Sequence, residues 1–312
     1  MRRALATLLT LALAACGGDD SGDDSGDGGG GGGGDGGQGG PDGGGGDGTW
    51  QTLLEGDWSL QPLEEGYYCI YATVPRDLYI KAFRPLIPLG THHTVLTLYE
   101  GNQPDGVVPC GSSTNGQNMI YGSGVGSPEF HFPDGIGLHL REGQRLLLNL
   151  HLYNAGDSVL EGTSGTMFQE ATAEEIEHEA EIVLAGPLVL DIDPGVQTEQ
   201  GNCQISNITD EPIYVFALSQ HMHRLGRRLR SVITRGEEEI ELQDVPYNFE
   251  NQTFQLVEPH VELLPGDVLT TYCTYDNDTG GKVGWGDSSD QEMCFTDLFY
   301  YPAQGATFIC PF

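Results

Sequence analysis

The sequence predicts an all-β protein built as two tandem antiparallel β-sandwich domains of jelly-roll-like form. Helical periodicity of apolar residues is nearly absent. Short runs of β-branched, aromatic and aliphatic residues recur instead between glycine, proline and aspartate turns, a pattern typical of sandwiches. The clearest predicted strands are residues 67–74, 94–99, 145–153, 182–192, 213–220, 229–234 and 268–275. Residues 172–181 favour one or two helical turns.

The first 15 residues have the form of an export signal. Arg2 and Arg3 precede an apolar run, residues 4–14, which is too short to span a bilayer. The run ends in Leu13-Ala14-Ala15-Cys16, which resembles the lipobox of bacterial lipoproteins. This resemblance implies cleavage before Cys16 and acylation of its thiol. We therefore expect an exported protein of the bacterial cell envelope, lipid-anchored at the outer membrane or cell surface. A simple signal peptide with a chance cysteine is the alternative.

The next segment, residues 16–48, cannot build a core. It is almost entirely glycine and aspartate, with no apolar residue larger than Pro41. Glycine gives flexibility and like charges extend a chain, so we expect a disordered tether. A break near Ala185-Gly186-Pro187 divides the remainder into a predicted N-terminal sandwich, residues 49–185, and a C-terminal sandwich, residues 186–312.

The net charge restricts the possible partners. The formal charge is −33, and acidic residues remain in excess after the tether. A field of this sign opposes binding to nucleic acid or anionic lipid. We therefore expect no nucleic-acid partner and a membrane contact through the lipid anchor only. We also expect a monomer.

Six cysteines follow Cys16. An even number in an exported chain favours three disulfides, and the lack of a Cys-x-x-Cys pair argues against metal ligation. Spacing alone leaves all fifteen connectivities open. The six are Cys69, Cys110, Cys203, Cys273, Cys294 and Cys310.

Two adjacent histidines, His92 and His93, stand at the start of the predicted strand 94–99. Adjacent residues of a regular strand point to opposite faces, so both could reach one metal only where the alternation breaks. Gly90 makes such a break possible. Taken alone, the pair is more simply explained by a structural role.

His221 and His223 follow the predicted strand 213–220. Residues i and i+2 of an extended backbone project from the same face, so the two imidazoles would lie side by side, as in half of a metal site. A chance His-x-His on a half-exposed strand is the alternative.

His151 and Met293 are each ambiguous. His151 lies in an apolar run that predicts a buried strand, where an unpaired polar group costs about 1–3 kcal/mol. It is therefore either a hydrogen-bonded core residue or a ligand. Met293 alone is most simply a core residue.

Considered together, these residues resemble the copper type II, ascorbate-dependent monooxygenases. That family includes peptidylglycine α-hydroxylating monooxygenase and dopamine β-monooxygenase, and its order is the same: paired histidines, a single histidine on a strand, His-x-His, then Met-Cys. The resemblance covers residues 55–312. The matching surroundings are Leu89-Gly90-Thr91-His92-His93 with Leu96, Leu148-Asn149-Leu150-His151-Leu152-Tyr153, His221-Met222-His223-Arg224-Leu225-Gly226, and residues 288–294 followed by Tyr300-Tyr301.

The resemblance implies two copper sites in two β-sandwiches. His92, His93 and His151 would hold one copper, and His221, His223 and Met293 would hold the other and form the catalytic site. The donor chemistry agrees, because imidazole suits copper and a thioether favours Cu(I). The implied cofactors are two copper ions per chain and ascorbate or another one-electron reductant.

The resemblance also implies the reaction, which is hydroxylation of an unactivated C–H bond by O2. The Met293 site would bind O2 and a small-molecule substrate and abstract hydrogen, while the three-histidine site would store and supply an electron. Three disulfides are implied as well: Cys69–Cys110, Cys203–Cys310 and Cys273–Cys294. The last would clamp the segment next to Met293.

The substrate-binding residues of the peptide-hydroxylating branch do not carry over. That branch has an arginine two positions before the His-x-His, and an asparagine and a tyrosine after the methionine; here Ser219, Phe295 and Asp297 stand in these places. A peptide C-terminal carboxylate is therefore not the expected substrate. The alternatives to an enzyme are a non-catalytic copper-binding or electron-handling lipoprotein of the same fold, and a β-sandwich adhesion module.

Five arginines follow His223 within a short stretch. Pairing with the abundant acidic residues is the simpler explanation, and a basic patch for an anionic reductant or substrate is the alternative. They are Arg224, Arg227, Arg228, Arg230 and Arg235.

Overall fold

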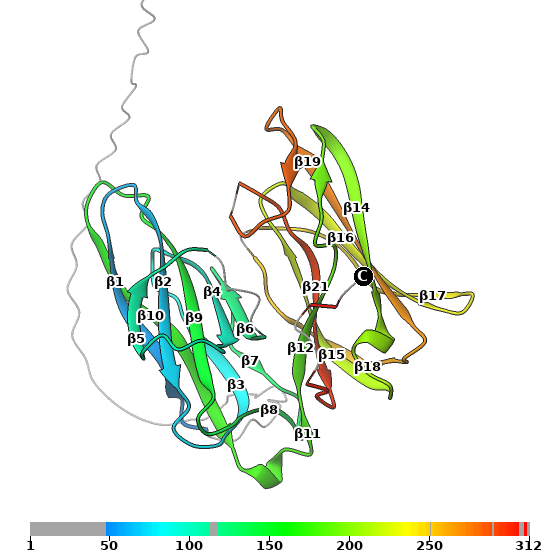
Figure 1. Ribbon diagram of the computed structural model, residues 1–312, viewed down its shortest axis with the longest axis horizontal. Coiled ribbons are helices and arrows are strands. Elements are labelled where there is room, and N and C mark those ends of the chain that lie inside the picture. Colours follow the sequence, from blue (N-terminus) through cyan, green and yellow to red (C-terminus); the bar gives the residue numbers. More distant parts are fainter. Residues whose placement is uncertain (1–47, 113–117, 250, 289, 306–308, 311–312) are drawn as a thin grey trace, which may run out of the picture. The chain divides into compact units, whose positions relative to one another are not determined.

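The computed structural model describes residues 48–112, 118–249, 251–288, 290–305 and 309–310. The predicted export signal, Cys16 and nearly all of the tether lie outside these residues. Within them the regular structure is almost entirely β-strand, beside two short 3-10 helices, η1 (Ala173–Glu175) and η2 (Ile205–Asn207), so the all-β prediction is confirmed (Figure 1). No helix of the described residues is long and apolar enough to cross a membrane.

Two sheets contain the strands from β1 to β11. One has the order β1-β10-β3-β8-β11, with β7 beside β3, and the other has the order β5-β2-β9-β4-β6. All of these pairs are antiparallel except β11 with β8. The bounds are β1 Gln51–Leu60, β2 Glu65–Thr73, β3 Leu78–Leu86, β4 Thr91–Leu98, β5 Gly106–Pro109, β6 Met119–Gly124, β7 Phe130–His131, β8 Ile136–Leu140, β9 Arg145–Tyr153, β10 Leu160–Ala171 and β11 His178–Glu179.

Strand β9 shows how sequence alternation positions the site. It is a central strand, bonded to β2 on one side and β4 on the other. Leu146, Leu148, Leu150 and Leu152 all belong to the apolar core between the sheets. Because side chains alternate along a strand, His151 projects from the opposite face of the sheet, where it is nevertheless buried.

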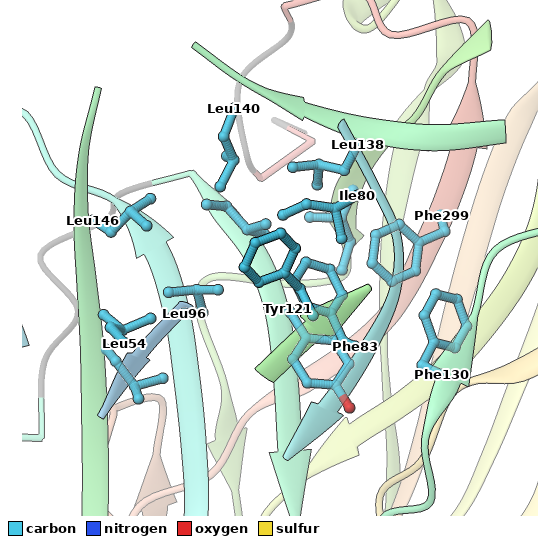
Figure 2. Packing of buried hydrophobic residues seen from close by; sticks show 14 of the residues in the cluster. Leu54, Ile80, Phe83, Leu96, Tyr121, Phe130, Leu138, Leu140, Leu146 and Phe299 are labelled. Atoms are coloured by element: carbon cyan, nitrogen blue, oxygen red, sulfur yellow. The ribbon is translucent and has the colours of Figure 1, made fainter. Parts of the chain in front are cut away.

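The core between these two sheets is aliphatic and aromatic. Figure 2 shows Ile80 and Phe83 of β3 close to Tyr121 of β6, with Leu54 and Leu96 in the same cluster. The rings of Phe83 and Tyr121 are stacked with centroids 4.7 Å apart. Burial of such side chains contributes about 1.5–3 kcal/mol each, and side chains of both β4 and β9 take part in this core.

The strands from β12 onward form a second set of sheets. Their orders are β12-β21-β15-β18, β14-β19-β16-β17 and the short pair β13-β20. The bounds are β12 Glu181–Ala185, β13 Asp191–Ile192, β14 Gly195–Gln204, β15 Ile213–Met222, β16 Gly226–Arg235, β17 Glu238–Pro246, β18 Gln255–Leu263, β19 Val268–Asn277, β20 Val283–Gly284 and β21 Cys294–Tyr301. Side chains of β12, β15 and β21 pack against those of β14, β16 and β19 in one apolar cluster.

An aromatic junction links the two sets of strands. Phe130 of β7 stacks on Phe299 of β21 with ring centroids 5.1 Å apart, and Phe132 lies 5.9 Å from Phe216 of β15. These rings belong to the same apolar cluster as the first core (Figure 2). The predicted division into two domains after Ala185 stays a prediction; β12, which precedes it, pairs with β21.

Three disulfides are present, Cys69–Cys110, Cys203–Cys310 and Cys273–Cys294. These are the three pairs that the family resemblance implies. The first lies in the sheet of β9, and the other two lie among the strands from β14 onward.

Candidate metal centres

A β-bulge brings His92 and His93 to one place. Strand β4 begins at Thr91, and its register against β9 shifts between Thr91 and His93, so the regular alternation of side chains breaks at this pair. His93 lies directly opposite His151. The break in alternation that both histidines need in order to reach one metal therefore occurs, and it lies at the start of the strand.

Gly90 allows the chain to enter this bulge. Its φ is +98°, a conformation that favours glycine, and a Cβ there would lie 2.7 Å from both Trp58 and Leu160. A larger residue at this position would displace the start of β4.

The three imidazoles of His92, His93 and His151 form a compact cluster. Nδ1 of His93 lies 3.1 Å from Nδ1 of His92 and 3.3 Å from Nδ1 of His151, and the three side chains could hold one metal ion. Two nitrogens bound at about 2.0–2.1 Å and at a tetrahedral angle to one ion lie about 3.4 Å apart. Neutral imidazoles have only one N–H each, so three converging Nδ1 atoms cannot all be paired by hydrogen bonds. The cluster fits a copper ion.

Glu65 and Tyr67 of β2 hold His151 in place. Nε2 of His151 donates to the Glu65 carboxylate at 2.6 Å, and the Tyr67 ring stacks on the imidazole with centroids 4.6 Å apart. Burial, together with the Glu65 carboxylate, raises the pKa of Tyr67 to about 12, so the phenol stays neutral. The hydrogen bond to Glu65 leaves Nδ1 of His151 as the nitrogen that faces the cluster.

Burial favours the neutral form of His93 and His151, which is the form that a metal requires. It lowers the pKa of His93 well below its ordinary value, and the neighbouring His151 and His92 lower it further. It also lowers the pKa of His151, against the opposing effect of Glu65.

His221 and His223 form a histidine pair at the end of β15. His221 is still in the strand and His223 follows it, while Met222 between them is fully buried in the core, as the i, i+2 spacing predicts. Nδ1 of His221 donates to Oε1 of Gln252 at 2.8 Å, and Nδ1 of His223 donates to the Gln291 carbonyl oxygen at 2.9 Å. Both rings therefore present Nε2 as the nitrogen available to a metal.

Burial lowers the pKa of His221 to about 3, and the adjacent His223 adds to this effect. It also lowers the pKa of His223, although the Gln291 carbonyl and Asp287 oppose it. This pair too consists of neutral imidazoles.

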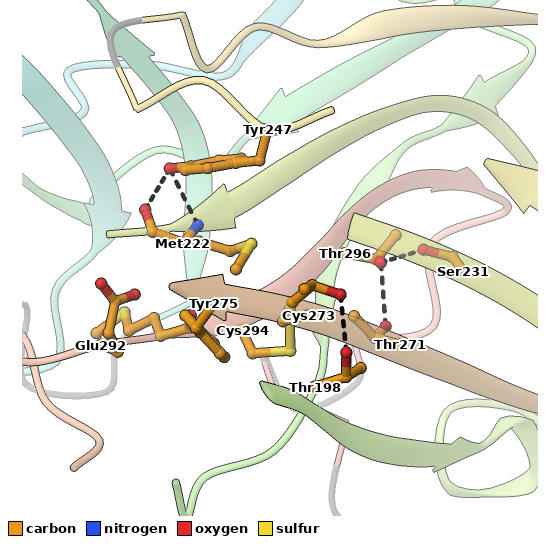
Figure 3. The surroundings of a disulfide bond; sticks show 12 residues. Thr198, Met222, Ser231, Tyr247, Thr271, Cys273, Tyr275, Glu292, Cys294 and Thr296 are labelled. Atoms are coloured by element: carbon orange, nitrogen blue, oxygen red, sulfur yellow. Dashed lines mark hydrogen bonds between the residues drawn. A yellow bond between two sulfur atoms is a disulfide. The ribbon is translucent and has the colours of Figure 1, made fainter. Parts of the chain in front are cut away.

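The backbone at Met293 is fixed beside this histidine pair. The Glu292 carboxylate accepts from the backbone N–H groups of His223 at 2.8 Å and Leu225 at 2.7 Å, and Tyr275 donates to the Met293 carbonyl oxygen at 2.7 Å. Figure 3 shows Tyr275 and Glu292 near the Cys273–Cys294 disulfide.

The Met293 side chain is half-buried and packs against the apolar cluster that contains Phe295 and Phe299. It is not among the residues that line the cavity described next. Its role as a third ligand stays a prediction.

One cavity of about 70 Å³ is lined by the five histidines of the two groups described above. The pair of His221 and His223 lies close enough to the three-histidine cluster that both residues contribute to the lowered pKa of His93. The segment after β17 reaches both groups, because Phe249 packs on His92 with ring centroids 5.0 Å apart and Gln252 bonds to His221. The cavity is lined by Tyr67, His92, His93, Thr94, Val95, Met119, Gly122, Ser123, Gly124, Val125, His151, Ser219, His221, His223, Phe249, Gln252, Phe254, Asp287 and Asp297.

Several residues that contact the histidines or line the cavity were not predicted from the sequence. Glu65 and Tyr67 share one face of β2, but their contact with His151 depends on the pairing of β2 with β9. Ser219 and Asp297, in places where the peptide-hydroxylating branch has other residues, do line the cavity, whereas Phe295 is buried in the core.

Three of the five arginines that follow His223 pair with acidic residues. Arg228 bonds to Asp244, Arg230 to Glu241 and Arg235 to Asp267. None of the five lines the cavity. Pairing with acids therefore explains most of this run.

The chain is similar to one family model and to several known proteins. Residues 179–310 match the family model of the copper type II ascorbate-dependent monooxygenase, C-terminal domain. The chain is 29% identical over 229 residues to DBH-like monooxygenase protein 1 of Mus musculus, covering 67% of this chain and 36% of that protein. It is 26% identical over 275 residues to tyramine beta-hydroxylase of Caenorhabditis briggsae, covering 77% and 46%. It is 26% identical over 275 residues to dopamine beta-hydroxylase of Homo sapiens, covering 77% and 44%. The matched region is thus less than half of each of these relatives.

Proposed function

Because the chain belongs to the copper type II, ascorbate-dependent monooxygenase family, we propose that it is a copper-dependent monooxygenase. Its substrate is a small organic molecule, hydroxylated at a C–H bond with O2 and with electrons from ascorbate or another one-electron reductant. The observation that carries this proposal is one cavity that is lined by both groups of histidines, of which His92, His93 and His151 converge closely enough to hold one metal ion.

In this proposal each chain binds two copper ions in separate mononuclear sites. His92, His93 and His151 hold one ion, and His221, His223 and Met293 hold the other. When bound, copper supplies the one-electron chemistry that O2 and a C–H bond require.

The protein's own groups prepare these sites. Glu65, Gln252 and the Gln291 carbonyl each accept a hydrogen bond from one imidazole, which fixes the nitrogen that faces the cavity. Phe249, Phe254 and Tyr67 line the same cavity with aromatic surface and limit the water around the reacting groups.

The primary test is the copper content of the chain beside His92→Ala and Met293→Ala. We expect two copper ions per chain, with about one lost or weakened in each variant. One copper or none in the unchanged chain would contradict the paired-site mechanism.

One observation favours a second candidate, a copper-binding or electron-handling protein of the same fold without turnover. The Met293 side chain packs against the apolar cluster instead of lining the cavity. Substrate-dependent oxygen uptake with a reductant separates the candidates, because only the monooxygenase consumes O2 in proportion to hydroxylated product. Peptides with a C-terminal glycine serve as the negative substrate.

We also propose, from the sequence of residues 1–48, that the protein is exported to the bacterial cell envelope and lipid-anchored at Cys16. Cys16→Ser should transfer the protein from the detergent phase to the aqueous phase in a detergent partition experiment. Equal partition of both chains would contradict the anchor.

A further inference from the structure

Two arginines differ from the other basic residues of the chain. Among the described residues, every lysine and arginine except Arg224 and Arg227 has a nitrogen within 4.0 Å of a carboxylate oxygen. Both of these arginines are exposed. Acidic partners are abundant in a chain with a formal charge of −33, so two neighbouring cations without one need a separate explanation.

The two arginines lie at one hydrogen-bonded turn, between β15 and β16. The N–H of Gly226 donates to the His223 carbonyl oxygen at 3.2 Å and closes the turn. Leu225 is buried in the core, and its N–H donates to the Glu292 carboxylate at 2.7 Å. The exposed arginines therefore project from a backbone that is fixed on its core side.

Most of the guanidinium donors at this turn have no partner. Nη1 of Arg227 donates to the carbonyl oxygens of Arg224 at 2.9 Å and Gly226 at 2.8 Å, which holds this guanidinium beside the turn. Its Nε and Nη2, and the whole guanidinium of Arg224, make no hydrogen bond to a described residue. A guanidinium can bind an anion through two parallel N–H groups, so the pair offers a place for a small anion.

The position of the turn indicates which anion it serves. Arg224 directly follows His223, a proposed copper ligand whose Nε2 is available to a metal. Neither arginine lines the cavity. A substrate must enter the cavity for its C–H bond to react. An electron donor needs only to come close to a ligand, because an electron can pass through a short stretch of protein.

We propose that Arg224 and Arg227 form the docking site of an anionic electron donor. The excess negative charge of the chain repels such a donor elsewhere, and this pair of cations attracts it to the turn beside His223. The donor then loses one electron and one proton; the electron reduces Cu(II) to Cu(I), and the proton passes to water. The proposal rests on the proposed function in taking bound copper and a one-electron donor as the reactants.

The experiment compares two one-electron donors of different charge on the full chain. The copper-loaded chain, in the Cu(II) form and without O2, is mixed with ascorbate, a monoanion at neutral pH, or with hydroquinone, which is neutral. Loss of the Cu(II) electron paramagnetic resonance signal gives the rate constant of reduction for each donor. This readout requires neither substrate nor turnover.

Two double variants identify the groups responsible. Arg224→Gln with Arg227→Gln should lower the rate constant for ascorbate about three- to tenfold and leave that for hydroquinone unchanged. Arg228→Gln with Arg230→Gln is the matched control, because it removes the same charge from two arginines that already have acidic partners. It should lower the ascorbate rate less than about twofold.

Two further variants separate charge from folding. Arg224→Lys with Arg227→Lys keeps both charges and should restore most of the ascorbate rate. If the double glutamine variant does not fold, Arg224→Gln alone decides, because this side chain makes no hydrogen bond to a described residue.

A second measurement does not require copper. Ligand-observed NMR of ascorbate with the copper-free chain should show binding that Arg224→Gln with Arg227→Gln weakens about three- to tenfold and that the control variant retains. Equal binding by the two double variants would count against the docking site.

Three kinetic results would also overturn the proposal: equal slowing by the two double variants, equal slowing for the two donors, or an unchanged ascorbate rate when Arg224 and Arg227 are replaced by glutamine. Any of these in a chain that binds two copper ions and consumes O2 with substrate would refute the docking site and leave the proposed function standing. Ascorbate binding through these arginines in a chain that takes up no copper would do the reverse.

Discussion

Nε2 of His151 donates a hydrogen bond to the carboxylate of Glu65 across 2.6 Å, and this bond leaves Nδ1 of the same ring facing His93. The two residues come from neighbouring strands, β9 and β2, so the orientation of a candidate ligand depends on a residue 86 positions away. A carboxylate behind a metal-binding imidazole fixes the ring and makes it a stronger donor.

Glu65→Gln should therefore weaken copper binding at the three-histidine cluster by about 10–100-fold. The glutamine oxygen can still accept from Nε2, but without the negative charge. The measurement is a copper titration against a competing chelator in a His223→Ala background, which isolates the cluster. Glu55→Gln, an exposed acid on β1, is the matched control and should have no effect. An unchanged affinity in Glu65→Gln would show that the hydrogen bond does not tune the site.

A second prediction concerns the close approach of β12 to β21 beside the Met293 segment. A Cβ on Gly186 would lie 1.7 Å from the carbonyl oxygen of Cys294, a backbone atom that cannot rotate away. Gly186→Ala should therefore lower the free energy of unfolding by about 1–3 kcal/mol and weaken copper binding at the His221, His223 and Met293 site. Urea unfolding and a copper titration in a His92→Ala background measure the two effects.

Gly281→Ala is the control for this change, because a Cβ there would meet no atom within 4 Å. Equal stability of Gly186→Ala and Gly281→Ala would show that β21 can shift without cost. A loss of stability without any effect on copper would separate the strand contact from the site.

Much of the fold was predictable because strands leave a local pattern. The apolar run around His151 predicted β9 with its observed bounds, and the i, i+2 spacing predicted that the imidazoles of His221 and His223 lie side by side, as they do with ring centroids 5.4 Å apart. The predicted strand 182–192 was wrong in its middle: β12 ends at Ala185 and β13 begins at Asp191, with Gly186 and Pro187 between them. The predicted helical turn near residue 172 is only the short η1.

The rest of the site could not be predicted from local patterns. Glu65 meets His151, and Gln252 meets His221, only because strands distant in sequence pair or lie close together. The place of Asp297 on the cavity wall depends equally on the packing of distant strands, since its position on an apolar strand gives no sign of the cavity. The periodicity of the sequence indicates which face of a strand a side chain occupies, but not which distant residue that side chain will contact.

A third prediction compares two disulfides that differ in loop length and in distance from the site. Replacing Cys273 and Cys294 by serine opens a link between residues 21 apart, beside Met293. Replacing Cys203 and Cys310 opens one between residues 107 apart. Chain entropy predicts losses of about 3 and about 5 kcal/mol respectively.

The effects on copper should have the opposite order. In Figure 3 the Cys273–Cys294 bond lies close to Met222 and Tyr275; Met222 lies between His221 and His223, and Tyr275 bonds to the Met293 carbonyl oxygen, so both adjoin the proposed second copper site. The Cys273→Ser, Cys294→Ser chain should therefore lose more copper affinity at that centre, although it loses less stability. Urea unfolding and copper titration of both double variants test whether the order of the two variants is reversed between stability and copper affinity. The same order in both measurements would mean that the disulfide acts only through global stability.

A last prediction concerns the dependence of stability on pH at a buried ion pair. The Asp267 side chain is 1% exposed, and it accepts from Arg235 at 2.7 Å and 2.9 Å and from the Leu264 N–H at 2.8 Å. Burial by itself raises the pKa of Asp267, but the hydrogen bonds from Arg235 and Leu264 outweigh it and hold the pKa below its ordinary value of 3.8.

The direction of this pH dependence follows from which state of the chain, folded or unfolded, binds a proton at the higher pH. As the pH falls, the unfolded chain protonates this acid before the folded protein does, so the stability that Asp267 contributes is present above pH 3.8 and is lost as the pH falls through the folded pKa. Asp267→Asn should lower the free energy of unfolding by about 2 kcal/mol at pH 7 and should have less effect as the pH falls below 3.8. Asp191→Asn, at the exposed pair with Lys282, should change it by less than about 1 kcal/mol at any pH. Urea unfolding of the three chains over a pH series makes the comparison, and a pH-independent deficit in Asp267→Asn would show that the charge of this acid does not contribute to folding.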